Sequence, residues 1–159
     1  MIATKLYWVE GPWPGKLAVA ARPRGGDWLA EEMAAWRSSG VNTVFSLLTP
    51  EEEAELDLTN EASTVAANGM RFLSFPIPDR EVPHSQSELT EALRRLDQEL
   101  SSGRNVALHC RQGIGRSGLV VACLLLTKGL DAETVVEHVS SARGTPIPET
   151  AEQRRWIDH

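Results

Sequence analysis

The sequence predicts a single α/β domain over residues 1–159, with three layers: a central, mostly parallel sheet of about five strands, and helices on both faces. Three observations lead to this prediction. The chain has 159 residues, the size of one ordinary domain. Hydrophobic residues make up 42% of it and charged residues 24%, as in a globular protein with its own core. Strand-like and helix-like segments alternate along it, which favours parallel strands joined by helices.

The first elements follow from short apolar runs and turn signals. Residues 5–10 and 16–21 are expected strands because the string Gly-Pro-Trp-Pro-Gly separates them. Apolar residues at helical spacing follow Asp27, a candidate cap, and this helix should end at Gly40. Residues 41–48 are rich in strand-forming side chains and are the next expected strand.

The middle of the chain continues the alternation. Thr49, a proline and three acidic residues predict a helix start, followed by an imperfect apolar stripe that ends at Gly69. Residues 70–75 are an expected strand. Ser85 and Glu88 form a capping box for a helix whose leucine stripe runs to Gly103.

The last third is predicted to hold one strand and three helices. The strand covers residues 105–109, and the helices cover 117–128, 131–142 and 149–157. Ligands of open α/β sheets bind beyond the carboxyl ends of strands, so a site is expected directly after residue 109.

Charge and cysteine content limit the partners and the compartment. The net charge is -6 and no basic stripe is present, so neither nucleic acid nor an anionic membrane is an expected partner. The longest apolar stretch, residues 118–127, is too short to span a bilayer. The start of the chain lacks the pattern of a secretory signal, and two cysteines without ligand-like spacing fit a reducing cytoplasm. A monomer is expected.

One stretch, residues 106–118, carries most of the chemical information: a buried strand runs into a glycine-bearing loop and then a helix. Gly113 and Gly115 tolerate positive φ, so the loop can curl until its N–H groups converge on one anion. The helix N-terminus favours phosphate there and also the thiolate form of Cys110. Arg116 provides a planar fork that fits two phosphoryl oxygens.

This pattern, His-Cys, five residues and Arg-Ser-Gly, resembles the signature of the protein tyrosine phosphatase superfamily, and its small dual-specificity branch most closely. The resemblance extends over nearly the whole chain. It implies that Cys110 attacks phosphorus to form a phosphocysteine and that Arg116 binds the phosphoryl oxygens. It also implies that Ser117 helps the thiolate to leave, and that His109 orients the loop and stabilises the thiolate indirectly, without acting as the base. No metal or cofactor takes part.

The resemblance further implies that the loop itself binds the substrate's phosphoryl group. Arg111 is either a solvated loop residue or a charge that steers the substrate, and the sequence leaves both readings open. The expected substrate-binding residues are Arg111, Gln112, Gly113, Ile114, Gly115 and Arg116.

A general acid is expected in the loop over residues 75–83. Three prolines and the lack of any helical or strand period mark this stretch as a surface connection, and it resembles the acid-bearing loop of the family. Asp79 is the candidate acid and Glu81 the fallback, although Asp79 alone would fit a turn cap equally well. Arg143 resembles a late arginine that supports the catalytic loop. Gln153 is either close to the active site or a solvent-facing helix residue.

These features predict a cysteine-dependent phosphatase of phosphorylated proteins. Phosphotyrosine is the expected substrate, extended to phosphoserine and phosphothreonine by a shallow pocket, with strict tyrosine preference as the alternative. Phosphoinositide or RNA 5'-phosphate hydrolysis remains a second enzymatic hypothesis, and a catalytically inactive phosphoprotein-binding module a third. Cys123 lies in an apolar helix and is expected to be a core residue, its rival role being a redox partner of Cys110.

Overall fold

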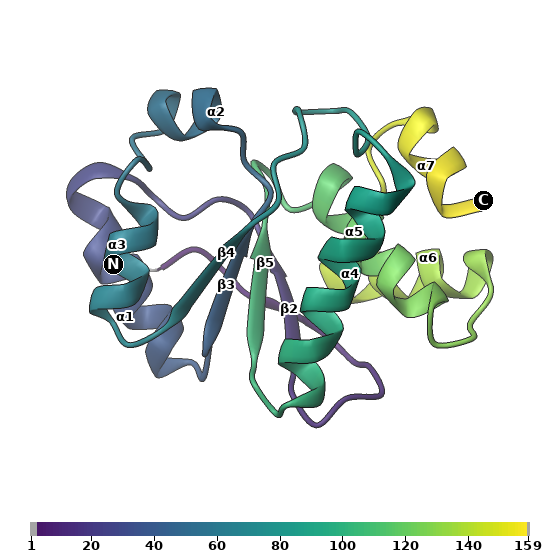
Figure 1. Ribbon diagram of the computed structural model, residues 1–159, viewed down its shortest axis with the longest axis horizontal. Coiled ribbons are helices and arrows are strands. Elements are labelled where there is room, and N and C mark those ends of the chain that lie inside the picture. Colours follow the sequence, from purple (N-terminus) through teal and green to yellow (C-terminus); the bar gives the residue numbers. More distant parts are fainter. Residues whose placement is uncertain (1–2, 159) are drawn as a thin grey trace.

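The computed structural model describes residues 3–158, so residues 1, 2 and 159 of the predicted domain lie outside the described range. Its centre is a five-stranded sheet in the order β1-β2-β5-β3-β4 (Figure 1). Only the β1–β2 pair is antiparallel among these neighbours, which confirms the predicted mostly parallel sheet. The strands are β1 (Tyr7–Val9), β2 (Leu17–Ala20), β3 (Thr43–Ser46), β4 (Arg71–Ser74) and β5 (Val106–His109).

Helices cover both faces of this sheet, which confirms the predicted layers (Figure 1). On one face lie α1 (Leu29–Ser38), which follows a 3-10 turn over Gly26–Trp28, and α3 (Glu61–Ala67). On the other lie α4 (Gln86–Ser101), α5 (Gly115–Leu126) and α6 (Ala132–Arg143), with α7 (Ala151–Asp158) packed against α5. The short α2 (Pro50–Glu55) lies over the edge of the sheet where the parallel strands end.

The central strands are buried along their whole length because helices cover them on both sides. Alternate residues of β5 point to different cores. Val106 and Leu108 join the apolar cluster under α4, α5 and α6, whereas Ala107 joins the cluster under α1 and α3. This alternation places the side chain of His109 on the α3 side and returns Cys110, the next residue, to the α5 side.

Two predicted helices differ from the structure. The helix expected between Thr49 and Gly69 is split into α2 and α3 by a turn in which Asp57 has a left-handed φ of 57°. The carbonyl of Asp57 accepts a hydrogen bond of 2.9 Å from the amide of Gly26, so a distant segment fixes the break. Asp27, the expected cap of α1, lies inside the 3-10 turn and its side chain caps nothing.

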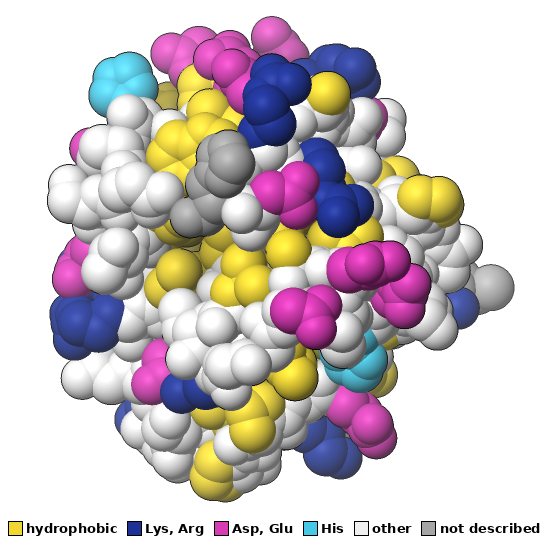
Figure 2. Space-filling view, turned by 90° about the vertical axis from the view of Figure 1, so that its right-hand side faces the viewer, with side chains coloured by type: hydrophobic (Ala, Val, Ile, Leu, Met, Phe, Trp, Pro, Cys, Tyr) yellow, Lys and Arg dark blue, Asp and Glu magenta, His cyan; other side chains and the backbone are white. Residues whose placement is uncertain are grey.

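Over residues 3–158, no helix is both long enough and apolar enough to cross a bilayer. Figure 2 views the molecule from the α7 side, and acidic and basic side chains are interspersed on this face. On this face the basic side chains therefore form no extended stripe.

Candidate active site

The catalytic loop connects β5 to α5 at the edge where the parallel strands end. One of its amides points at Cys110: the N–H of Gly113 donates a hydrogen bond of 3.2 Å to the Cys110 Sγ atom. Gly113 has a φ of 72°, and a Cβ atom there would lie 2.7 Å from the carbonyl oxygen of Ala20. Only glycine fits, as the sequence predicted, and Cys110 is only 2% exposed.

Gly115 is a glycine for a different reason from the one predicted. It begins α5, two residues before the expected helix start at Ser117, and its φ is not positive. A Cβ atom at Gly115 would lie 2.9 Å from Oε1 of Gln153. The residue therefore allows α7 to approach the start of α5 closely, rather than allowing the loop to turn.

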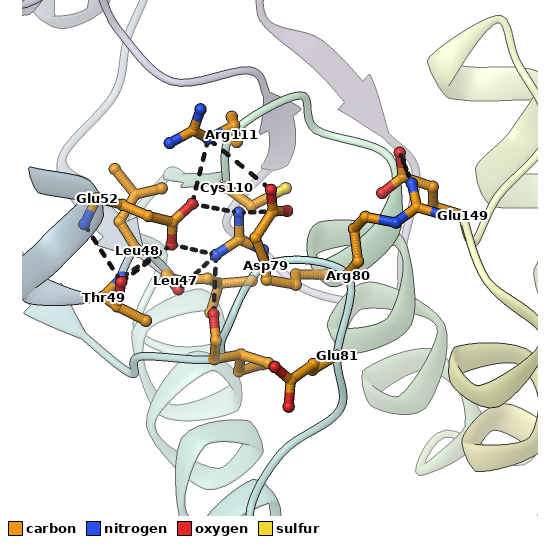
Figure 3. A network of polar contacts seen from close by, with 12 residues as sticks. Leu47, Leu48, Thr49, Glu52, Asp79, Arg80, Glu81, Cys110, Arg111 and Glu149 are labelled. Atoms are coloured by element: carbon orange, nitrogen blue, oxygen red, sulfur yellow. Dashed lines mark hydrogen bonds and ion pairs between the residues drawn. The ribbon is translucent and has the colours of Figure 1, made fainter. Parts of the chain in front are cut away.

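Arg116 is buried with its guanidinium among oxygen acceptors (Figure 3). Nη1 and Nη2 donate to the two carboxylate oxygens of Glu52 at 2.6 and 2.8 Å, and Nη1 also donates to the carbonyl of Ile77 at 2.8 Å. Burial opposes the charge of Arg116, but the bonds to Glu52 and the nearby Cys110 sulfur outweigh burial and raise its pKa. The guanidinium is therefore a fixed cation near Cys110.

Glu52 connects this guanidinium to the start of α2. Its Oε1 accepts a hydrogen bond of 3.1 Å from the amide of Thr49, whose hydroxyl accepts one of 3.3 Å from the Glu52 amide, so the two form a capping box. Burial alone would raise the pKa of Glu52, but the bonds from Arg116 and Thr49 outweigh burial and lower it. Glu52 is thus an ionised partner of Arg116 at neutral pH.

Asp79 lies in the active site and Glu81 does not. The Oδ1 atom of Asp79 accepts a hydrogen bond of 2.9 Å from Nη2 of Arg116, whereas the Glu81 side chain points away from this guanidinium (Figure 3). This contact favours Asp79 over Glu81 as the general acid.

Arg111 faces the carboxylates around the site. Its Nε donates to Glu52 at 3.3 Å and lies 3.9 Å from Oδ2 of Asp79, while Nη2 donates to Glu55 at 3.0 Å. Burial opposes the charge of Arg111, yet the bonds to Glu52 and Glu55 raise its pKa. Its charge is engaged with acids, and the contact with Asp79 joins the loop to the segment that carries this aspartate.

The acid-bearing loop is tied to the C-terminal part of the chain by two contacts. The guanidinium of Arg80 lies 3.1 Å from the carboxylate of Glu149 (Figure 3). The Nε2 atom of Gln153 donates to the carbonyl of Glu81 at 3.0 Å. Gln153 is completely buried, which excludes the solvent-facing reading. Arg80 has a left-handed φ of 64°, an unfavourable backbone state for a residue with a Cβ atom.

Arg143 supports the catalytic loop, in the way the sequence suggested. Its Nε donates to the carbonyl of Gly113 at 2.9 Å and its Nη2 to the carbonyl of Gln112 at 3.0 Å. Ser117 is buried on the first turn of α5. Within residues 3–158 its hydroxyl has no hydrogen-bond partner.

The side chain of His109 lies on the α3 side of the sheet and contacts Glu61. Its Nε2 atom lies 2.5 Å from Oε2 of Glu61 in α3, both side chains are completely buried, and the ring packs near Trp36. An influence of His109 on the thiolate would therefore pass through the backbone between β5 and Cys110. Sequence reasoning missed Glu61, because only the folded sheet brings α3 against β5.

Cys123 lies in α5 as a free thiol, as Cys110 is. Burial raises the pKa of Cys123 to about 11, so the residue is a neutral thiol at physiological pH. This environment favours the expected core role over the redox role.

The comparisons with known proteins agree with one another. A family model described as "Polymorphic toxin system, DSP-PTPase phosphatase" matches residues 18–130. Cyclin-dependent kinase inhibitor 3 of Rattus norvegicus is 29% identical over 123 residues, which cover 76% of this chain and 58% of that protein. The chain therefore spans a little over half the length of this curated relative.

Solved structures share the fold. The crystal structure of kinase-associated phosphatase with its catalytic cysteine replaced by serine has a TM-score of 0.89 at 21% identity, covering 99% of this chain and 93% of that one. Tk-PTP in its active form has a TM-score of 0.77 at 25% identity, covering 96% and 92%. The sheet and helices described above therefore have the arrangement found in these proteins.

Proposed function

Because this chain belongs to the family of dual-specificity and tyrosine phosphatases, we propose that it hydrolyses phosphoryl groups on protein side chains through a phosphocysteine. The observation that carries this proposal is the convergence of three groups at one point. The Gly113 amide bonds to the Cys110 sulfur, the Arg116 guanidinium lies beside that sulfur, and Asp79 bonds to the same guanidinium.

In the first step, the Cys110 thiolate attacks phosphorus and the bond from phosphorus to the substrate oxygen breaks. Asp79 gives its proton to that departing oxygen. Arg116 and the loop amides bind the three outer phosphoryl oxygens, on which charge accumulates in the transition state. Asp79 must therefore release Nη2 of Arg116 when the phosphoryl group enters.

In the second step, water attacks the phosphocysteine. The Asp79 carboxylate takes a proton from that water, the sulfur–phosphorus bond breaks, and the Ser117 hydroxyl donates to the sulfur as it becomes a thiolate again. Inorganic phosphate leaves, and the enzyme returns to its starting state. The bonds and protons of both steps balance without a metal or a cofactor, using only Cys110, Asp79, Arg116 and Ser117.

Phosphotyrosine is the proposed substrate, with phosphoserine and phosphothreonine as further substrates. Proteins rather than lipids or RNA are favoured by the net charge of -6, which repels both anionic surfaces. The proposed place of action is the cytoplasm, where reducing conditions keep the nucleophile a free thiol.

The test compares two cysteine variants. Wild-type protein should hydrolyse para-nitrophenyl phosphate and phosphotyrosine peptides, and Cys110→Ser should abolish turnover while still binding the peptide. Cys123→Ser is the matched control, since it removes the other thiol from the same helix-loop region and should keep full turnover. Hydrolysis retained by Cys110→Ser would remove this residue from the mechanism.

A substrate panel separates the remaining hypotheses. Phosphopeptides, phosphoinositides and 5'-phosphorylated RNA are compared by kcat/KM. Highest efficiency on a lipid or RNA substrate would replace the protein-phosphatase proposal. Tight phosphopeptide binding without any turnover would instead identify an inactive binding module.

A further inference from the structure

A groove with a volume of about 490 Å³ lies between the end of β4 and helix α4. Its apolar surface includes Phe45 of β3 and, directly after β4, Phe75 and Pro76. The helix contributes Glu88 and Arg95, which lie on one face of α4 because they are two turns apart. The groove is therefore an apolar hollow with charged groups along one wall, and the acid-bearing loop closes one end of it.

The strand beside this groove is the last one on its side of the sheet (Figure 1). In a strand, the main-chain groups of successive residues point to opposite sides, and the amides of Arg71 and Phe75 donate toward β3, each at 2.9 Å. Phe72 and Ser74 therefore turn their N–H and C=O groups outward, and within residues 3–158 no strand pairs with them. Such an edge can accept one more strand.

The wall of the groove carries one carboxylate without a partner. Two acidic residues, Glu88 and Glu91, and one arginine, Arg95, line it. Arg95 lies 3.3 Å from Glu91, and the pKa of Glu91 is lowered to about 2 by its bonds to arginines, so this pair is ionised and engaged. Across the described part of the chain, the exposed side chain of Glu88 makes no ion pair or hydrogen bond. Glu88 is therefore available to a cationic side chain.

We infer that an extended segment of a partner protein binds here, pairs with β4 as an additional strand, inserts an apolar side chain into the groove and brings a lysine or arginine to Glu88. Main-chain hydrogen bonds to the edge provide affinity, and the groove and the carboxylate select the sequence. The apolar and basic residues of the segment are two positions apart, because alternate side chains of a strand share a face. A second copy of this chain is a poorer match, because each copy has a net charge of -6.

Two fluorescein-labelled peptides test the sequence preference by fluorescence anisotropy. One is Thr-Val-Thr-Leu-Thr-Lys and the other has the reverse order, because an added strand can run in either direction. At least one of them should bind, and replacing its lysine by glutamine should weaken binding by about two- to fivefold, as expected for an exposed ion pair. Glu88→Gln should cause the same loss with the lysine peptide and none with the glutamine peptide.

Glu137→Gln is the matched control, because it makes the same change of charge on an exposed residue of α6 and should leave peptide binding unchanged. Hydrogen exchange then tests strand addition itself. With the peptide at about ten times its Kd, exchange of the Phe72 and Ser74 amides should slow by about tenfold, whereas the Leu73 amide, which faces β3, should change little. Methylation of alternate peptide amides should abolish binding in one phase and spare it in the other.

Several results would overturn the inference. One is the absence of binding by either peptide up to about 1 mM, and another is an equal loss in Glu88→Gln and Glu137→Gln, which would indicate unspecific attraction of charge. Binding without protection of Phe72 and Ser74 would make the groove a pocket for apolar groups only. Protection of both amides without peptide, together with a dimer in sedimentation, would assign the edge to a second copy of this chain. None of these readouts needs turnover, so they remain decisive if the protein hydrolyses no phosphopeptide.

Discussion

Replacing Glu52 by glutamine tests whether a buried carboxylate holds Arg116, the arginine proposed to bind phosphate, in place. The substitution keeps the size of the side chain but removes its charge. The guanidinium of Arg116 is 1% exposed, so it would lose the partner that contacts both of its terminal nitrogens. The bonds from Arg116 to Asp79 and to the Ile77 carbonyl would remain.

The structure sets the size of the effect. Removing one partner of a buried ion pair costs about 3–5 kcal/mol, and the remaining partners of Arg116 place the cost near 3 kcal/mol, the lower limit of that range. For a domain of this size, the melting temperature should fall by about 6–12 °C. A displacement of Arg116 by 1 Å should lower kcat/KM by about 100-fold.

The pH dependence of this effect has a definite sign. The folded-state pKa of Glu52 lies below its usual value of 4.5, because the bonds from Arg116 and Thr49 outweigh burial. The stability that Glu52 contributes is therefore complete above pH 4.5 and is lost as the pH falls through the lowered pKa. The gap in melting temperature between wild type and Glu52→Gln should be constant near neutral pH and shrink in acid.

The assay combines thermal melts across this pH range with turnover of para-nitrophenyl phosphate. Glu51→Gln is the control, because it makes the same change of charge on an exposed residue of the same helical turn and should alter neither property. A Glu52→Gln protein that melted within 2 °C of wild type and kept its kcat/KM would refute the reasoning.

Three further substitutions test the other parts of the site. Asp79→Ala should lower kcat on phosphotyrosine peptides by ~10²–10⁴-fold and remove the basic limb of the pH-rate profile; an unchanged profile would move the acid role to Glu81. Gly113→Ala should lower both stability and turnover far more than Gly103→Ala, because both glycines have positive φ but only Gly113 is crowded by neighbouring atoms. Equal losses in the two variants would mean that backbone strain, and not crowding, causes the loss. Cys123→Ser should not change inactivation by peroxide, since the pKa of Cys123 is about 11, and altered inactivation would show a redox role.

Local signals in the sequence were sufficient for the sheet and for the catalytic loop. Alternating segments predicted the parallel sheet, and the spacing of Cys110, Gly113 and Arg116 predicted a loop that gathers around an anion. These features depend on neighbours within a few residues, where glycine conformation and helix termini act directly. The assignment of catalytic roles to these residues stays a prediction until the variants are measured.

Contacts between distant segments could not be predicted in this way. Glu52 carries the signal of a helix cap and nothing that marks it as the partner of Arg116, 64 positions further along. The break between α2 and α3 depends on the hydrogen bond from the Gly26 amide to the Asp57 carbonyl. The amphipathic pattern of the sequence does not contain this contact, so it predicted one helix in place of two. The sequence left open whether Gln153 lies near the active site or faces solvent, because its burial against Gly115 arises from the packing of α7.

Arg80 contacts Glu149, which lies just before α7, and Gln153 of α7 contacts Glu81, so the C-terminal part of the chain holds the loop that carries Asp79, the proposed general acid. In the proposed mechanism, capture of the phosphoryl group and protonation of the departing oxygen therefore depend on separate parts of the chain. A change on α7 can slow the release of the dephosphorylated product chain while leaving affinity for the phosphate itself intact. The rate of this chemistry can consequently diverge among proteins whose catalytic loops are identical.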